Sequence, residues 1–270
     1  MLGHMGAASM KELADLRAPA QVENSLSVKR ALVLFAVYLV LPYAFSFLFY
    51  VILGIYSSVA TDLGHIDPSA VPEFLAPFDL PVGILSLLFT AIIVFRMTRR
   101  TLPGSISTGA LASLGWRASS ISSILLACCI GLAITIGYLF ILLPAIPPVE
   151  GQTWGPLATA AESGGWQRFC WAVTGLLLAP LIEEFLFRGI LFTGLSNAYG
   201  TYLSTAIVTI LFIALHISEA MHYWPAWIAI STLAVITILL RIRTRSLLPA
   251  VAAHFSYNLA LVFAVYAGNA

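Results

Sequence analysis

Long apolar runs, separated by short polar connections, make up most of the chain. None of them shows the strict alternation of a half-buried strand. A membrane helix needs about 20 apolar residues, and a bilayer leaves helices as the natural way to satisfy the backbone of such a run. We therefore expect seven membrane helices, at residues 31–56, 80–95, 121–143, 166–195, 201–216, 223–240 and 247–266.

The predicted fold class is all-α, a polytopic transmembrane helical bundle with about seven or eight membrane helices. The number eight stays open because the fourth run, residues 166–195, is longer than one crossing requires. The segment Ser196–Gly200 is typical of a turn and separates the fourth helix from the fifth.

Composition supports a membrane protein. The chain is 60% hydrophobic and 9% charged, whereas soluble domains carry about 25% charged residues. The net charge of +1 gives no indication of a nucleic-acid partner. Cys128, Cys129 and Cys170 have neither disulfide nor metal-site spacing, so we interpret them as small packing residues.

The charges alternate along the chain as the positive-inside rule predicts. Basic residues gather in the tail 1–30 and after the second and sixth runs. The connections 57–79, 144–165 and 217–222 carry acids and no lysine or arginine. This pattern predicts an integral, multi-pass protein with a cytoplasmic N-terminus and, if there are seven spans, a C-terminus on the outside.

Glu183, Glu184 and Arg188 lie inside the fourth apolar run. Ionised groups at membrane depth are costly and usually functional. Glu184 and Arg188 are four residues apart and can pair on one helix face, whereas Glu183 points about 100° away. A buried structural pair would explain Glu184 and Arg188, but not the second carboxylate. Pro180 removes a backbone hydrogen bond to Leu176, so the helix is expected to open here.

Three further polar residues lie in later runs. His216 ends the fifth run, and His254 and Asn258 share one face of the last. Taken alone, His216 is more typical of an interfacial or packing residue than of a catalyst. His254 and Asn258, each taken alone, are equally compatible with an interhelical hydrogen bond and with a functional role. At ~1.5 Å per residue, however, Glu183, His216 and Asn258 fall within one layer about 10 Å thick. We therefore expect one polar pocket between these helices.

Together these motifs resemble a known family. Glu183-Glu184-x-x-x-Arg188, Phe212-x-x-x-His216 and His254-x-x-x-Asn258, on three separate helices, resemble the CAAX-processing and bacteriocin-processing (CPBP, Abi-like) intramembrane endopeptidases, which include the type II CAAX prenyl proteases. The pattern of polar and apolar residues gives a polar N-terminal tail at 1–30 and N-terminal membrane helices at 31–120. The resemblance covers roughly residues 120–266 and implies a catalytic membrane core at 121–268.

The resemblance also implies residue roles. Glu183 would be the general base and, with His216, would hold and activate a water. His254 and Asn258 would stabilise the oxyanion, and Glu184 and Arg188 would support the site. No cofactor is favoured. Glu183, His216 and His254 form an alternative zinc set, although no His-Glu-x-x-His motif is present.

The expected partners are a peptide or lipidated-peptide substrate and the lipid bilayer, and the sequence leaves the oligomeric state open. Two other functions compete. A proton-coupled transporter could use the same polar groups, but the chain shows no repeated halves. A non-catalytic membrane scaffold or immunity protein would keep the polar residues for packing alone.

Overall fold

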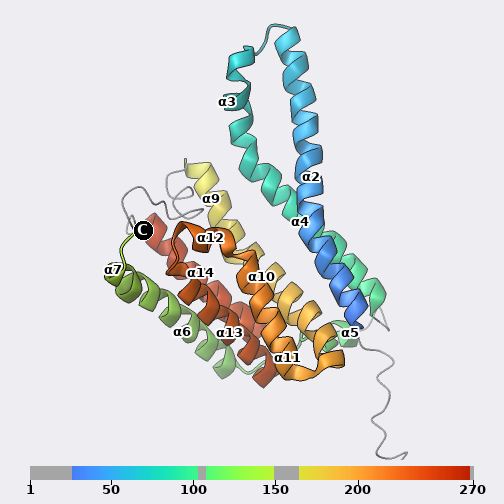
Figure 1. Cartoon of the computed structure of the whole chain (residues 1–270), viewed down its shortest axis with the longest axis vertical. Helices are drawn as coiled ribbons and strands as arrows, with labels where there is room; N and C mark the ends of the chain where they lie inside the picture. Colours follow the sequence, from blue (N-terminus) through green and yellow to red (C-terminus); the bar gives the residue numbers. More distant parts are fainter. Residues whose placement is uncertain (1–25, 103–107, 149–163, 268–270) are drawn as a thin grey trace, which may run out of the picture.

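The computed structural model describes residues 26–102, 108–148 and 164–267, so the predicted tail 1–30 lies almost wholly outside it. Its regular structure is helical throughout the described residues, which confirms the all-α prediction (Figure 1). Within these described residues, six helical stretches are long and apolar enough to cross a membrane. They are Val28–Asp62, Pro68–Thr101, Ile121–Ala145, Gly165–Leu215, Ala226–Thr244 and Leu248–Tyr266.

Several of these stretches contain more than one element. The main helices are α2 (Val28–Asp62), α4 (Asp79–Thr101), α6 (Ile121–Gly137), α9 (Gly165–Val173), α10 (Ala179–Glu184), α11 (Phe192–Leu215), α13 (Ala226–Thr244) and α14 (Leu248–Tyr266). Short helices join them: α3 (Val71–Leu75), α5 (Thr108–Ser113), α7 (Leu143–Ala145) and α12 (Ile217–His222). Single 3₁₀ turns η1 (Pro68–Ala70) and η2 (Ala76–Phe78) flank α3, and π-helical segments η3 (Tyr138–Leu142), η4 (Thr174–Leu178) and η5 (Phe185–Leu191) interrupt longer helices.

The stretch Gly165–Leu215 is 51 residues long, about 76 Å if it were straight at ~1.5 Å per residue. It reverses at Gly200, whose φ of 75° and ψ of 170° are not helical. Glycine tolerates this positive φ because it has no Cβ. The predicted turn at Ser196–Gly200 is therefore confirmed, and the predicted fourth and fifth helices are the two arms around it.

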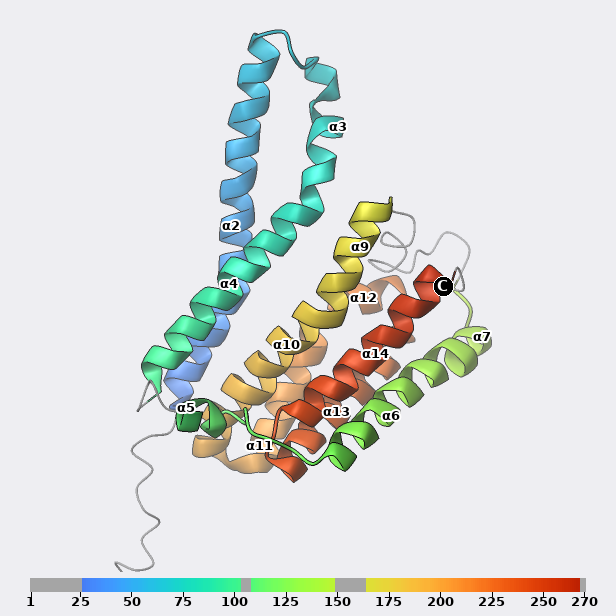
Figure 2. The ribbon, with the colours of Figure 1, turned by 180° about the vertical axis from the view of Figure 1, so that it is seen from behind.

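Helices α2 and α4 form a hairpin whose tip stands away from the other helices (Figures 1 and 2). α2 has 35 residues, so its length of about 52 Å exceeds a hydrocarbon core of ~30 Å. It begins and ends several residues beyond the predicted 31–56. Near its start, Ala31 packs so closely on Gly194 that a Cβ there would lie 2.3 Å from the Ala31 Cβ. This contact holds the base of the hairpin against α11.

α14, which carries two predicted site residues, packs tightly on α6. A Cβ on Gly131 would lie 2.1 Å from the backbone oxygen of Ala253. One helical turn further on, the Thr135 hydroxyl donates a hydrogen bond of 2.8 Å to the Tyr257 carbonyl. Small residues commonly allow such close approach between membrane helices. The result is a fixed position for the face of α14 that lies next to His254.

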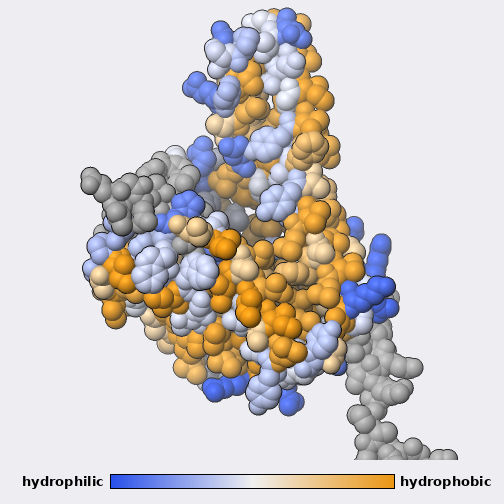
Figure 3. All heavy atoms as spheres, viewed as in Figure 1, coloured by the Kyte–Doolittle hydropathy of each residue, from blue (hydrophilic) through white to orange (hydrophobic). Residues whose placement is uncertain are grey.

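The outer surfaces of the helices are largely apolar, as expected for contact with lipid (Figure 3). The buried apolar core surrounds η5 and the second arm of α11. Phe187, Ile190, Val208 and Ile238 have no exposed surface in it. The same core encloses Glu184 and Arg188, which are also fully buried.

Candidate active site

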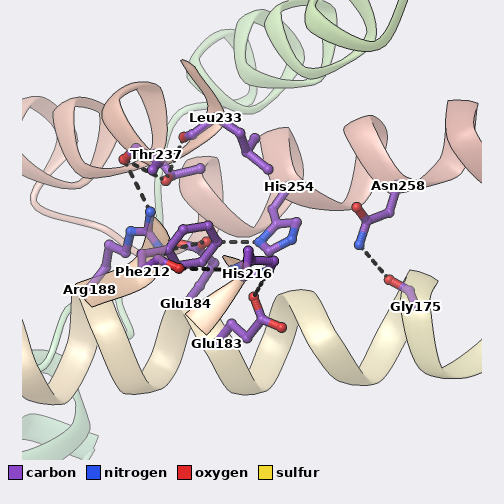
Figure 4. Close-up of polar contacts among 11 residues, drawn as sticks. Gly175, Glu183, Glu184, Arg188, Phe212, His216, Leu233, Thr237, His254 and Asn258 are labelled. Atoms are coloured by element: carbon purple, nitrogen blue, oxygen red, sulfur yellow. Dashed lines mark hydrogen bonds and ion pairs between the residues drawn. The ribbon is translucent and has the colours of Figure 1, made fainter. Parts of the chain in front are cut away.

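A cavity of about 210 Å³ lies between α10, α11, α13 and α14. Glu183, His216, His254 and Asn258 all line it. Figure 4 shows Glu183, His216 and His254 close together, while Asn258 lies further along α14 and points to Gly175. The structure therefore brings to one cavity the four polar residues that were expected, from their helical spacing and membrane depth, to share a pocket.

Wide π-helical turns lie on both sides of the helical segment that carries Glu183. α10 follows η4 and precedes η5. Such segments are uncommon and occur frequently at functional sites. Pro180 lies at the start of α10, where its missing N–H leaves the preceding turn free to widen. The opening expected near Pro180 thus takes the form of π-helical backbone, and the long fourth run needs no additional break.

Glu184 stands at the centre of a buried ionic group. Its Oε1 lies 3.2 Å from Nη1 of Arg188 and 2.9 Å from Nδ1 of His254. Arg188 also donates a 3.1 Å hydrogen bond to the Ala234 carbonyl, and its guanidinium lies 4.3 Å from the centre of the Phe212 ring. A fully buried charge is tolerable only when it is paired and hydrogen-bonded. This group joins η5, α13 and α14 around one carboxylate.

Glu184 also sets the hydrogen position on His254. A carboxylate only accepts hydrogen bonds, so Nδ1 of His254 carries the proton in this contact. The second ring nitrogen, Nε2, is then left for the cavity that His254 lines.

Glu183 and His216 face each other across a wider gap. Glu183 Oε2 and His216 Nε2 are 3.7 Å apart, with side chains 19% and 24% exposed. The opposite nitrogen, Nδ1 of His216, donates to the Phe212 carbonyl at 2.9 Å, and its ring stacks on Phe212 with centroids 4.5 Å apart. At 3.7 Å a direct hydrogen bond is too long, and a water within reach of both atoms is the natural bridge.

Asn258 lies on the cavity wall but is already engaged. Its Nδ2 donates a 2.7 Å hydrogen bond to the carbonyl of Gly175 in η4. An amide nitrogen has two hydrogens, so one remains. The contact ties α14 to the π-helical segment before α10, a role that the sequence did not indicate.

Comparison with known proteins points to the same region. Residues 165–260 match the family model described as type II CAAX prenyl endopeptidase, Rce1-like. This segment is Rce1-like. It contains every residue of the three motifs, and the predicted resemblance is confirmed. Searches of curated proteins and of solved structures found no match to the chain.

The Rce1-like segment also supplies cavity residues that the sequence analysis did not single out. Trp171, Tyr223 and Tyr257 line the cavity, together with Tyr138 from outside the segment. The Tyr223 hydroxyl donates to the Ile146 carbonyl. Tyr257 lies three residues after His254, so its helical spacing was the available signal. Phe212 also has a role that the sequence did not indicate. Its motif position was clear from the sequence, but its ring contacts both His216 and Arg188.

The alternative zinc set is not supported by the arrangement of donors. Among the described residues, no three His, Cys, Asp or Glu side chains come together as a group that could hold a metal ion. The residues present in the Rce1-like segment therefore do not fit a zinc centre.

Proposed function

We propose that this protein is an intramembrane endopeptidase that hydrolyses a peptide bond with a water activated by Glu183, as in CAAX-type prenyl-protein processing. The observation that carries the proposal is the facing pair of Glu183 Oε2 and His216 Nε2, 3.7 Å apart on the wall of one cavity. The match of residues 165–260 to an endopeptidase family supports it.

The pair provides what amide hydrolysis requires first, an activated nucleophile. A neutral His216 has its proton on Nδ1, so Nε2 can accept a hydrogen bond from a water. The Glu183 carboxylate accepts the other proton of that water and removes it as the oxygen attacks the substrate carbonyl. The same proton then passes to the departing amine, which balances the reaction. General-base groups of this kind contribute about 10²–10⁴-fold to rate.

His254 and Asn258 are proposed to stabilise the negative oxygen of the intermediate. With Nδ1 donating to Glu184, His254 becomes a donor at Nε2 when the ring carries both protons. The second N–H of Asn258 is a neutral donor on the same wall. Donors already in place cost no reorganisation when charge develops, which is the basis of oxyanion stabilisation.

The cavity wall fits a peptide that carries apolar groups. Beside the four polar residues, its lining is mainly aromatic and aliphatic, including Phe212, Ile230 and Leu261. We propose a lipidated or otherwise apolar peptide as substrate, entering from the bilayer. The cavity is too small for a folded protein, so the scissile bond must lie in an extended segment.

Cleavage of a prenylated CAAX-type peptide by the purified chain, in detergent and in liposomes, tests the proposal. Glu183→Gln should lower cleavage by at least about 100-fold without altering thermal unfolding. Glu73→Gln, on the exposed connection of the hairpin, is the matched control and should cleave normally. Unchanged cleavage by Glu183→Gln would contradict the proposal. If the unmodified chain conducts ions and Glu183→Gln abolishes that flux, the protein is a transporter. If Glu183→Gln unfolds and the unmodified chain cleaves nothing, the protein is a scaffold.

A further inference from the structure

A separate groove lies on the other side of α10 from the candidate active site. Ala179 and Glu183 of α10 line the active-site cavity. Leu181 and Ile182, between them in sequence, line a separate groove of about 700 Å³ whose opposite wall is α4. The groove continues into an apolar pocket of about 310 Å³, because Ala91, Phe95 and the same two α10 residues border both.

The α4 wall of the groove is apolar at one end and positively charged at the other. Leu88, Ala91 and Ile92 form the apolar part, and Arg96, Arg99 and Arg100 follow on the same face. Leu88 and Arg100 are about 18 Å apart along the axis at ~1.5 Å per residue. The deeper pocket is bordered by Phe95 and Phe185, whose ring centroids are 6.0 Å apart.

We propose that this groove binds an anionic diacyl phospholipid, with its phosphate at Arg96 and Arg100 and an acyl chain against Ala91, Leu181 and Ile182. The assignment follows from charge complementarity. The residues that line the groove include three arginines and no acid. An apolar channel that ends in exposed guanidinium groups matches an amphiphile with a negative head and a hydrocarbon tail. Arginine also pairs phosphate oxygens in a bidentate manner.

A zwitterionic phospholipid would bring a cationic amine group close to Arg96 and Arg100 along with its phosphate, and a soluble anion would leave the apolar channel empty. A second copy of the chain would have to offer an acidic group next to an apolar ridge. The phospholipid satisfies both halves of the groove at once, and the bilayer supplies it at high concentration. Each basic residue near an anionic lipid surface raises affinity about fivefold.

Native mass spectrometry of the purified full chain tests the assignment. The chain is mixed with equimolar phosphatidylglycerol and phosphatidylcholine of identical acyl chains, and the bound ratio is measured. Arg96→Gln/Arg100→Gln should reduce phosphatidylglycerol binding about 25-fold. Arg243→Gln/Arg245→Gln removes two exposed charges elsewhere and should leave it unchanged.

A charge-neutral variant tests the apolar half. Ala91→Phe fills the channel and should also abolish the preference for phosphatidylglycerol, with thermal unfolding showing whether the variant is folded. Equal binding of both lipids by the unmodified chain would overturn the proposal. So would full binding by Arg96→Gln/Arg100→Gln, or a dimer that Ala91→Phe dissociates. Because lipid binding is measured without substrate, it is independent of the proposed proteolysis and can be repeated on Glu183→Gln.

Discussion

Nδ1 of His254 lies 2.9 Å from Oε1 of Glu184, across the interface between α14 and α10. This contact joins the buried ion pair to the cavity wall. It fixes which nitrogen of His254 holds a proton, and it gives the Glu184 carboxylate a partner besides Arg188. We therefore propose a positioning role for Glu184, the second acid of the Glu-Glu motif, whereas Glu183, the first, lines the cavity.

Replacing Glu184 should damage both stability and activity. Glu184→Gln leaves Arg188 fully buried without its counter-charge, and breaking a buried pair in this way costs about 3–5 kcal/mol. Thermal unfolding in detergent measures the loss. An unfolding temperature equal to that of the unmodified chain would show that the pair contributes nothing.

His216 should be important for catalysis with little effect on stability, because its side chain is 24% exposed. His216→Ala should lower kcat/KM for peptide cleavage by about 10²–10⁴-fold and change the unfolding temperature little. His222→Ala, at an exposed position in α12, is the control and should retain full activity. Equal activity of the two variants would remove His216 from the mechanism.

Asn258 should affect catalysis through the π-helical segment as well as through the cavity. Asn258→Ala removes the hydrogen bond to the Gly175 carbonyl, which costs about 1 kcal/mol for a typical bond of this kind. We expect a small fall in stability and a larger fall in kcat, measured by unfolding and by steady-state cleavage. A fall in stability with unchanged kcat would restrict Asn258 to a structural role.

The contact between α6 and α14 should tolerate no side chain at Gly131. Gly131→Val places a Cβ 2.1 Å from the Ala253 oxygen, so the helices must separate. Overpacking of this kind costs about 1–3 kcal/mol or more. Gly137→Ala, where a Cβ meets nothing within 4 Å, is the control and should unfold like the unmodified chain. Equal unfolding temperatures for the two variants would contradict this packing.

The helical fold could be predicted from the sequence because a long apolar run in a bilayer can satisfy its backbone hydrogen bonds within itself only as a helix. The turn before Gly200 and the pairing of Glu184 with Arg188 followed from local spacing and are present. Helix ends were less predictable. α2 continues to Asp62 rather than ending near residue 56, although most of the residues 57–62 are polar and weak helix formers.

Features that depend on contact between distant segments could not be read from the sequence. Nothing local indicated that His254 would contact Glu184, or that Asn258 would donate to Gly175, 83 residues away. The π-helical turns around α10 also escaped prediction, although Pro180 marked the place.

A double-mutant cycle on Glu183 and His216 tests the central claim most directly. The kcat/KM for cleavage of a prenylated peptide is measured for Glu183→Gln, His216→Ala and the double variant. Residues that activate one water act as a unit, so the double variant should be about as slow as the slower single variant. The shared role of the two residues would be contradicted if the fold-losses in kcat/KM of the two single variants multiply in the double variant. It would also be contradicted if the double variant cleaves at the rate of the unmodified chain.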